Sequence, residues 1–480
     1  MPAVRRPSSL VEKILKVEAP GGPAATAALT VPSVVEPGEM FTLKVAVADA
    51  MGYPSVAFAG TLSLRGPFAS TDAVDVTFEA GRPAVAQVVD VHVDVEGVHR
   101  FETDLDGKVF HSNPLRCTRG PSHRVYWGDP HVHTTLSDCM TEQCRSLQFC
   151  YAAARWFAGL DFVCPADHVS NGRCTLGKWM EQRAAQEVWH DPPAFVTLPG
   201  YEASLKGGAG GDNNVYFLGE LPMFIDEYED GNARTLAEKL AEVLPREDFI
   251  LVPHHTTRTG KHGEYNDEMY PGADVTPVVE IHSKWGTSEY RGNPNPLKKI
   301  HPGPSYVVDL LKQGFPLGFI GGTDTHSTMP AGFGRDHINA LPGMTAVMTD
   351  ELTRESVFRA IRNRCCYAAS LERILLDVDV SGTPMGQRIG WPETTKPREI
   401  RATVAAQSDI TSVDVVRNGE TVDTRTPNDW QAALSVTDTD DLKRLRLSSS
   451  HLGDFVTYYI RVTCASGAQA WSSPVWLVGL

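Results

Sequence analysis

RVYWGDPHVHTTLSD (124–138) sets the interpretation of the middle of this chain. In this segment an apolar run leads directly into His131 and His133, which stand two residues apart. Because side chains on a strand alternate between its two faces, both imidazoles are expected on one face. Two imidazoles on one face suit a metal ion, although such a pair also arises by chance. Residues further along the chain are therefore needed to decide between a metal site and a chance pair.

Five further apolar runs downstream also end in residues that can bind a metal. They lead to Asp167 and His168, to Glu202, to His254 and His255, to Glu280 and His282, and to Asp324 and His326. Barrels of alternating strands and helices place catalytic groups at the carboxyl ends of their strands. So many ionisable groups would be costly to bury without compensation, and divalent cations supply it. The sequence therefore predicts a multinuclear metal site.

Helical patterns alternate with these strand-like runs from residue 123 to residue 374. They cover residues 146–159, 233–244, 306–314 and 355–364. Alternation of strands and helices over this length is typical of a mainly parallel sheet or a closed α/β barrel. We therefore expect an α/β domain over 123–374, with a (β/α) barrel as its architecture.

The two flanks of this segment have a different, all-β character. Residues 1–122 contain short alternating runs such as FTLKVAVADA (41–50), separated by Pro and Gly. Residues 375–480 look similar, and Asn418-Gly419 is a strong signal for a tight hairpin turn. The sequence therefore predicts a β-sandwich-like module at each end of a multidomain α/β and all-β chain.

Composition limits the classes of partner. The chain has 480 residues and a formal net charge of −15, which argues against a broad nucleic-acid-binding surface. No apolar stretch reaches the roughly 18–20 residues of a membrane span, and the first residues carry no signal-peptide pattern. We therefore expect a soluble, cytoplasmic protein that binds neither nucleic acid nor membrane.

Histidine and cysteine both concentrate in the middle segment. Of 16 histidines, eleven lie between His131 and His337, as expected where metal or proton-transfer chemistry takes place. Of nine cysteines, five lie between Cys139 and Cys174, and none has C-x-x-C spacing. They could form a disulfide or a zinc knot beside the site. We favour the alternative, in which they are buried small apolar residues in a reducing compartment.

From about Val125 to the 370s, the chain resembles the PHP (polymerase and histidinol phosphatase) superfamily of metal-dependent phosphoesterases. It is most similar to PHP-like proteins with flanking modules, a domain family of unknown function (DUF3604). Six motifs in the expected order carry the resemblance: GDPHVHTTLSD (128–138), PADHVS (165–170), GYEAS (200–204), VPHHTT (252–257), EIHSKWGTSE (280–289) and FIGGTDTHS (319–327). The resemblance implies a distorted (β/α) barrel of PHP type.

The resemblance also implies a set of metal ligands. One metal would take His131, His133, Glu202 and Asp324, and Glu202 would bridge to a second metal held by His254 and His282. The family pattern favours His254 over its neighbour His255. A third position would use His168, His326 and Asp138. Many PHP proteins have His where this chain has Asp138, so two versus three metals stays open.

Mixed imidazole and carboxylate ligands suit Zn²⁺, Mn²⁺ or Fe²⁺ better than Mg²⁺ or Ca²⁺. Adjacent ions can activate a bridging water and hold both oxygens of an in-line displacement. The chain has no G-x-S-x-G, Walker A or H-E-x-x-H motif. We therefore expect a metal-bound hydroxide to attack phosphorus or sulfur directly.

An ester anion also needs cationic or hydrogen-bonding groups besides the metals. The candidates near the motifs are Lys284, Arg258, His262, Arg335 and His337. Lys284 stands two residues after a proposed ligand, so it could hold the anion or protonate the leaving oxygen. The alternative for each of these residues is a solvated loop charge.

The leading hypothesis is a hydrolase of small phosphate mono-, di- or triesters, and such enzymes can be promiscuous. An aryl sulfate ester hydrolase on the same site is the near alternative. A non-catalytic metal-containing protein, whose β-modules bind a carbohydrate or protein, is a third. The amidohydrolase superfamily fits less well, since Asp324 is followed by His326 and Glu202 is present. The sequence leaves the oligomeric state open, including a homo-oligomer.

Overall fold

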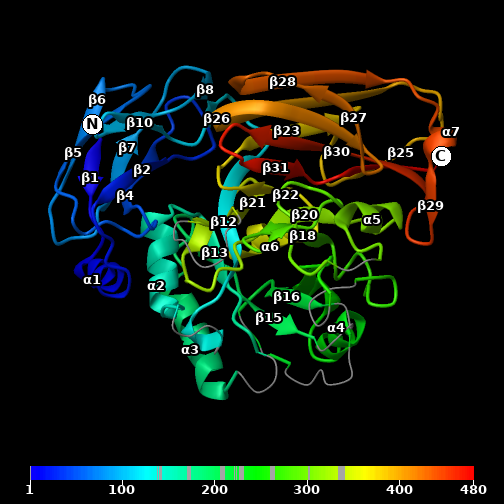
Figure 1. Cartoon of the computed structure of the whole chain (residues 1–480), viewed down its shortest axis with the longest axis horizontal. Coiled ribbons are helices and arrows are strands. Elements are labelled where there is room, and N and C mark those ends of the chain that lie inside the picture. Colours follow the sequence, from blue (N-terminus) through cyan, green and yellow to red (C-terminus); the bar gives the residue numbers. More distant parts are fainter. Residues whose placement is uncertain are drawn as a thin grey trace.

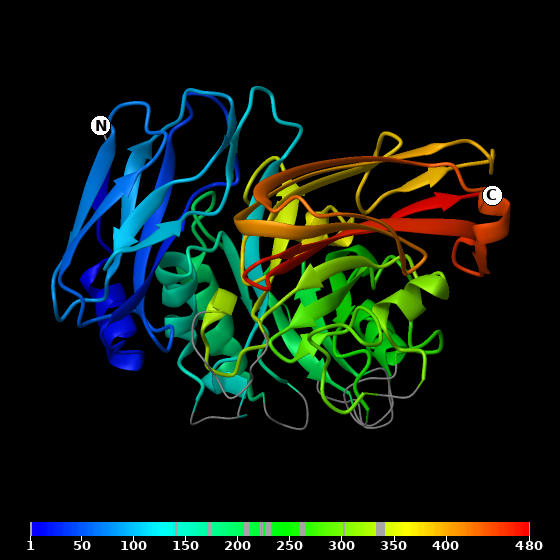
Figure 2. The ribbon, with the colours of Figure 1, turned by 45° about the horizontal axis from the view of Figure 1, so that its top comes forward.

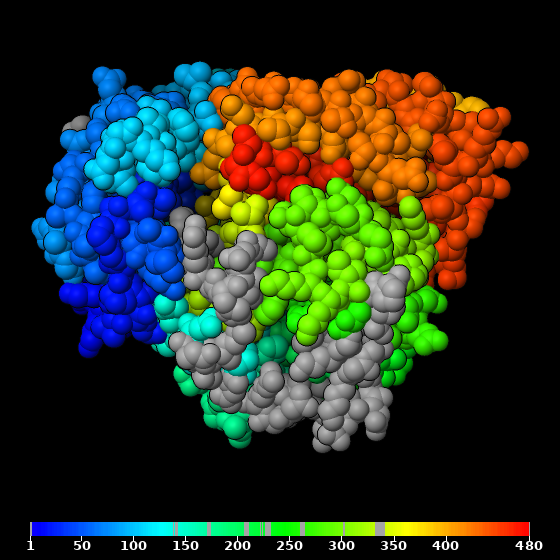
Figure 3. Space-filling view, in the orientation of Figure 1, coloured from blue at the N-terminus to red at the C-terminus, as the bar shows by residue number. Residues whose placement is uncertain are grey.

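The computed structural model describes residues 2–137, 139, 143–169, 174–205, 211–220, 222, 224–225, 232–259, 265–300, 303–332 and 341–479. The first hundred or so residues form one end of the molecule, and the last hundred lie across the middle segment (Figures 1 and 2). In the space-filling view, the strands near the C-terminus lie directly against the middle segment (Figure 3).

The N-terminal segment contains two four-stranded antiparallel sheets. One consists of β1 (Ala3–Arg5), β7 (Val85–Val91), β4 (Phe41–Asp49) and β2 (Ala24–Thr30); the other of β10 (Lys108–His111), β9 (Glu102–Leu105), β5 (Gly60–Arg65) and β6 (Ala73–Phe78). A small third sheet joins β3 (Val34–Val35), β11 (Leu115–Cys117) and β8 (Gly97–His99). Alternate residues such as Leu43 and Leu62 face one shared core, which buries the apolar side of each sheet. Helix α1 (Ser9–Glu18) precedes β2.

The described residues of the middle segment form five α-helices, and four of them lie where the sequence pattern predicts them. These are α2 (Leu147–Ala152), α4 (Ala233–Ala241), α5 (Val307–Lys312) and α6 (Arg354–Arg362); α3 (Leu176–Trp189) is additional. A π-helical turn, η2 (Ala153–Phe157), extends α2, and short 3-10 turns are η1 (Thr135–Ser137), η3 (Arg246–Asp248) and η4 (Pro330–Gly332). Ser, Thr or Asn side chains cap α2, α3, α4 and α6, which explains where these helices begin.

The expected (β/α) barrel is wrong. The chain is 43% strand and 16% helix, and the described strands of this segment belong to three separate sheets rather than one closed ring. The first contains β12 (Arg124–Val132), β13 (Phe162–Pro165), β14 (Val196–Thr197), β21 (Gly343–Thr349) and β22 (Cys366–Ser370). The second contains β15 (Gly200–Ser204), β16 (Asp212–Phe217) and β17 (Phe249–Pro253); the third contains β18 (Val278–Ser283), β19 (Gly286–Thr287) and β20 (Gly318–Gly321).

Strand direction is the physical reason for this error. β15, β16 and β17 pair antiparallel, and so do β12, β21 and β22. A barrel of repeated strand–helix units requires parallel neighbours throughout. Alternating helical and strand periodicity locates the elements along the chain, but it does not specify which strands pair.

The sheet that contains β12 continues into the C-terminal segment. β22 pairs with β31, β31 pairs with β30, and β30 pairs with β26. The strands after β22 are β23 (Leu375–Val380), β24 (Thr383–Pro384), β25 (Arg388–Gly390), β26 (Arg398–Arg417), β27 (Glu420–Arg425), β28 (Asp429–Asp438), β29 (Leu447–Ser449), β30 (Gly453–Cys464), β31 (Gln469–Ser472) and β32 (Val475–Val478), with α7 (Leu442–Leu445) between β28 and β29. Asn418 and Gly419 both have positive φ, as the tight hairpin turn requires.

The aromatic residues of the last strands are core residues. Trp471 and Trp476 are fully buried, and Tyr458 and Tyr459 nearly so. They therefore offer no exposed stacking surface for a sugar. None of the described helices has the length and apolar character needed to cross a membrane.

Candidate metal centre

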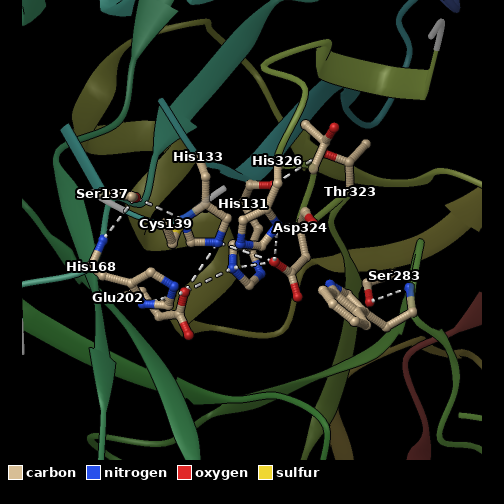
Figure 4. A network of polar contacts seen from close by, with 12 residues as sticks. His131, His133, Ser137, Cys139, His168, Glu202, Ser283, Thr323, Asp324 and His326 are labelled. Atoms are coloured by element: carbon tan, nitrogen blue, oxygen red, sulfur yellow. Dashed lines mark hydrogen bonds and ion pairs between the residues drawn. The ribbon is translucent and has the colours of Figure 1, made fainter. Parts of the chain in front are cut away.

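Histidines and carboxylates from distant parts of the chain converge at the ends of the middle strands (Figure 4). His131 is on β12 and His133 follows it; His168 follows β13, Glu202 is on β15, His254 and His255 follow β17, and Asp324 and His326 follow β20. Seven of these eight residues are buried, and His168 is the partly exposed one. The structure thus brings together most of the ligands that the motifs predict.

Glu202 is one centre of this cluster. Its Oε2 lies 3.1 Å from His133 Nε2 and 3.2 Å from His168 Nδ1. Its Oε1 lies 3.2 Å from His254 Nε2. A carboxylate whose two oxygens face imidazoles from three strands has the geometry of a bridging ligand.

Asp324 is the other centre. Its Oδ1 lies 3.0 Å from His133 Nε2 and 3.6 Å from His131 Nε2, and its Oδ2 lies 2.8 Å from His255 Nε2. Asp324 and His255 both have φ near +50°, a left-handed conformation that non-glycine residues seldom adopt. Such backbone strain persists where the surroundings impose it, and it gathers at functional sites.

Among the described residues, four sets of ligand atoms lie close enough to hold an ion, with the atoms of each set within 4.8 Å of one another. They are His133, Cys139, His168 and His326; His131, His133 and Asp324; His131, Glu202 and His254; and His254, His255 and Asp324. The sets share members, so they form one continuous cluster. His254 and His255 both belong to it, and the cluster does not decide between them.

Hydrogen bonds around the cluster orient two of the imidazoles. His131 Nδ1 lies 3.0 Å from Glu280 Oε2, which can only accept when ionised, so His131 donates and leaves Nε2 for a metal. The Ser137 hydroxyl donates to Asp167 at 2.6 Å and lies 3.0 Å from His133 Nδ1. Ser137 therefore accepts from Nδ1–H, and the Nε2 of His133 also faces the cluster.

Buried atoms without partners provide a test of whether a metal fits. His131 Nε2 and Glu202 Oε2 are buried, and neither has a hydrogen-bond partner of good geometry among the described residues. Leaving such groups unsatisfied costs about 1–3 kcal/mol each, or more for a charge. A divalent cation would satisfy both atoms, and the nitrogen and oxygen donors are those that Zn²⁺, Mn²⁺ and Fe²⁺ accept. The residues present fit the expected metal.

The electrostatics of the cluster keep its carboxylates ionised. Burial alone would raise the pKa of Glu202, but the positive potential of His168 and the close imidazoles of His131, His133 and His254 hold that pKa well below its usual range. Burial would likewise raise the pKa of Asp324, yet its histidine neighbours lower it strongly. The site therefore presents anionic oxygens at neutral pH.

His282 lies apart from the cluster, although the resemblance implies that it is a ligand. Its Nε2 is 2.7 Å from the Leu341 carbonyl oxygen and its Nδ1 is 2.8 Å from Thr287 Oγ1. Its ring stacks on Trp471 with centroids 5.5 Å apart. Pairing of β18 with β20 shifts register between Glu280 and His282. Glu280 reaches His131, whereas the His282 ring bonds to Thr287 and Leu341.

Two predicted cations lie in the described part of the chain. Lys284 is buried, and its backbone N–H donates to the Thr323 carbonyl at 3.0 Å, beside Asp324. Arg258 lies over the Trp285 ring, 5.1 Å from its centroid. Trp285 in turn packs edge-on against His255 and His326, each at 5.9 Å. The other predicted residues, Asp138, His262, Arg335 and His337, lie outside the described residues.

Several supporting residues were not assigned a role from the sequence. Asp129 accepts from the N–H of His131 and Ala331 and from both the N–H and the hydroxyl of Thr323, and so joins three segments of the site. Asp167 was noted only as a strand-end residue, yet it accepts from Thr134 and Ser137. A carboxylate inside an apolar run was the only signal available for Asp129 and Glu280.

Cys139 joins one ligand set, whereas Cys144, Cys150 and Cys164 are buried. All nine cysteines lie in the described part of the chain and all are free thiols. The disulfide interpretation is thus excluded for the described structure. The buried-residue interpretation holds for those three residues and not for Cys139 and Cys174, which are only partly buried.

Comparison with known proteins gives relatives but no activity. No family model matches the chain. It is 27% identical over 380 residues to an uncharacterized protein of Chlamydia pneumoniae, covering 77% of this chain and 60% of that protein. An uncharacterized protein of Chlamydia trachomatis is 26% identical over 396 residues, covering 79% and 62%. The chain thus spans about 60% of the length of the curated relatives it matches.

Solved structures resemble the chain only weakly. A Salmonella alpha-2-macroglobulin aligns with a TM-score of 0.18 and 10% identity, covering 96% of this chain and 24% of that one. A Bacteroides uniformis beta-glucuronidase 2 aligns with a TM-score of 0.21 and 9% identity, covering 95% and 61%. Scores this low carry no argument about fold or function.

Proposed function

We propose that the chain is a metal-dependent hydrolase of small phosphate esters that belongs to the PHP superfamily. The observation that carries the proposal is the pair of buried carboxylates, Glu202 and Asp324, each surrounded by imidazoles from separate strands. The proposal depends on this arrangement of ligands and not on a closed barrel.

The residues divide into metal positions by the atoms they share. His131, His133, Glu202 and Asp324 would hold one ion. Glu202 would reach a second ion through Oε1, on the side of His254. Bound divalent ions supply Lewis acidity, which lowers the pKa of water and neutralises charge that develops on the ester.

The chain's own residues keep these donors in a fixed geometry and exclude water from behind them. Glu280 and Ser137 fix the tautomers of His131 and His133, respectively, so that Nε2 of each faces inward. We assign Lys284 and Arg258 to the ester anion. Arg258 stacks on Trp285, which packs against two histidines of the cluster, so its charge is held beside the site.

The test is a metal analysis of freshly purified protein combined with turnover assays. Aryl phosphate mono-, di- and triesters and an aryl sulfate would be assayed before and after chelation. The proposal expects two or three ions per chain and phosphate ester turnover that chelation abolishes and reloading restores. Preference for the sulfate would reassign the substrate while keeping the mechanism.

Two histidine variants make this test specific. His131→Ala should abolish turnover and lower the metal content, while the far-ultraviolet circular dichroism of the β-rich chain is retained. His451→Ala is the matched control, because His451 bonds to Asp267, outside the cluster. Wild-type turnover in His131→Ala would overturn the proposed site. Bound metal with no turnover on any ester would favour a non-catalytic metal protein.

A further inference from the structure

Asn214 is a buried residue that has no role in the motifs or in the ligand sets. It is on β16, and its side chain is fully buried. Neither its Nδ2 nor its Oδ1 has a hydrogen-bond partner of good geometry among the described residues. Most buried polar side chains in proteins are hydrogen-bonded, so an amide with both ends unsatisfied needs an explanation.

Strand pairing places Asn214 between two residues of the metal cluster. It stands opposite Glu202 of β15 on one side and opposite Val252 of β17 on the other. Directly opposed residues of an antiparallel pair project from the same face of the sheet, with Cβ atoms about 4.5–5.5 Å apart. His254 follows Val252 by two residues. Glu202 Oε1 and His254 Nε2, which are 3.2 Å apart, therefore meet on the face from which Asn214 projects.

The neighbours of the amide indicate which way each of its ends points. The Tyr216 hydroxyl is beside the amide without the geometry of a hydrogen bond, and it donates its own proton to the Pro130 carbonyl at 2.9 Å. This oxygen can therefore only accept, which places Nδ2 on its side and leaves Oδ1 on the other. The other side is the His254 end of the sheet, since the His254 N–H donates to the Asp212 carbonyl at 3.1 Å. Oδ1 thus points toward the contact between imidazole and carboxylate.

The second metal position, beside Glu202 Oε1, lacks one of its expected ligands. The resemblance gives this position His254 and His282 in addition to the bridging carboxylate, but both ring nitrogens of His282 bond outside the cluster. The described set at this position consists of His131, Glu202 and His254. Without His282, the position is one donor short of what the resemblance implies.

We propose that the Asn214 amide oxygen is a ligand of the second metal ion and takes the place that the resemblance gives to His282. Carbonyl oxygens suit Mn²⁺, and with Glu202 and His254 the amide gives a mixed set of oxygen and nitrogen donors. A bound ion would satisfy Oδ1, which accounts for an amide that is otherwise unfavourable to bury. The inference rests on the proposed function for the presence of the ions, and it concerns the identity of one ligand.

Metal binding by variants of Asn214 tests this ligand without reading turnover. The full chain is stripped by chelation and titrated by equilibrium dialysis with Mn²⁺ and, separately, with Zn²⁺. Asn214→Leu keeps a branched side chain of similar size but has no donor atom, so we expect its second ion to bind more weakly. Loss of a partner behind a ligand typically costs about 10–100-fold in metal affinity, and loss of a ligand should cost at least as much. His282→Gln should keep the wild-type number of ions.

The stability of the metal-free protein is a second measurement, on which a merely structural amide would have the opposite effect. An unsatisfied amide destabilises the folded chain, so Asn214→Leu should raise the denaturation midpoint after chelation. Added metal should then raise that midpoint less than it does in wild type. Asn214→Asp supplies an oxygen ligand but adds a negative charge beside Glu202. It should lower the midpoint after chelation and keep the number of bound ions.

Asn113→Leu is the matched control. Asn113 is equally buried, but its Oδ1 accepts from the Val31 N–H and its Nδ2 donates to the Val31 and Pro114 carbonyls. Its replacement should lower the midpoint with and without metal and leave metal binding unchanged. Wild-type metal binding by Asn214→Leu, or a metal-free midpoint that falls as in Asn113→Leu, would overturn the inference and leave the hydrolase proposal intact. Absence of any bound divalent ion in wild type would overturn both.

Discussion

Glu280 Oε2 lies 3.0 Å from His131 Nδ1, and both side chains are buried. The contact needs a glycine beside it, because a Cβ at Gly322 would lie 2.6 Å from both Glu280 Oε2 and His131 Cβ. A carboxylate behind a metal-binding imidazole fixes its tautomer and raises its basicity. Sequence position gave no such role to Glu280, which reaches His131 from another sheet.

Glu280→Gln should therefore weaken metal binding without removing a ligand. The neutral amide keeps the shape but loses the charge that supports His131, and we expect affinity to fall about 10–100-fold. Competition with a chromophoric chelator measures this change. Glu238→Gln, on an exposed position of α4, is the control and should leave affinity unaltered. Wild-type affinity in Glu280→Gln would show that this carboxylate does not support the site.

Lys284→Ala should slow turnover while the metal content stays at the wild-type level. The ammonium is assigned to the substrate anion, so its loss should cost about 2–4 kcal/mol of transition-state stabilisation, a range typical of one lost electrostatic donor. Steady-state rates and metal analysis on the same preparation provide the measurement. Lys312→Ala, an exposed lysine on α5, is the control. Loss of metal from Lys284→Ala would instead give this lysine a structural role.

Glu289→Ala should destabilise the attachment of the last strands to the middle segment. Glu289 is buried and accepts from the Tyr459 hydroxyl at 2.6 Å, the Arg461 guanidinium at 2.8 Å and the Trp471 indole N–H at 2.7 Å. Removing it leaves a largely buried guanidinium without this partner, at an expected cost of about 3–5 kcal/mol in the free energy of unfolding.

Denaturant unfolding, followed by tryptophan fluorescence, measures the effect of Glu289→Ala. Glu355→Ala breaks an exposed pair with Arg359 and should cost less than about 1 kcal/mol. If both variants lose the same stability, the buried contacts of Glu289 contribute nothing beyond a surface pair.

Asp438 makes stability depend on pH. Burial alone would raise its pKa, but bonds from the Asp440 N–H, the Tyr458 hydroxyl and the Arg417 guanidinium hold the pKa below its usual value. For a carboxyl whose folded pKa is depressed, the stabilisation is present above the unfolded pKa of about 3.9. It is lost as the pH falls through the folded value.

Asp438→Asn should therefore lower the denaturation midpoint near neutral pH, and the gap from wild type should narrow below about pH 4. Denaturant titrations at several pH values provide the measurement. Asp440→Asn is the control, because Asp440 contacts the same Arg417 from an exposed position and should change the midpoint little. A difference in midpoint between wild type and Asp438→Asn that is the same at every pH would show that the stabilisation by Asp438 does not depend on its charge.

Short-range patterns predicted the elements of the fold better than their assembly. Helical spacing placed α4 and α6 almost at their observed bounds, since an amphipathic face and an Asn or Thr cap are local signals. The observed sheets differ from the predicted barrel because strand pairing depends on residues far apart in the sequence. The local pattern does not show that β15 pairs with β16, or that β22 pairs with β31. Alternation along the chain was therefore insufficient to specify a barrel.

The same distinction applies to the site. His131, His133 and Asp324 were identifiable because each directly ends an apolar run. His282 ends a similar run, yet its ring bonds to Thr287 and Leu341, while Glu280 within the run is the residue that reaches His131. Asp138, the third-position ligand that the motif implies, lies outside the described residues, whereas its neighbour Cys139 belongs to one of the described ligand sets. The position of a residue in a motif at the end of a strand is therefore not enough to identify it as a metal ligand.

The pairing of β22 with β31 has a practical consequence for dissecting the chain. If residues after Ser370 are removed, β22 becomes an edge strand with unsatisfied N–H and C=O groups. Such an edge recruits other copies, and the loss of Trp471 also uncovers the ring of His282. Fragments cut at this point should self-associate into β-rich aggregates, so a deletion series cannot isolate the metal-binding part. Substitutions within the intact chain are the appropriate approach.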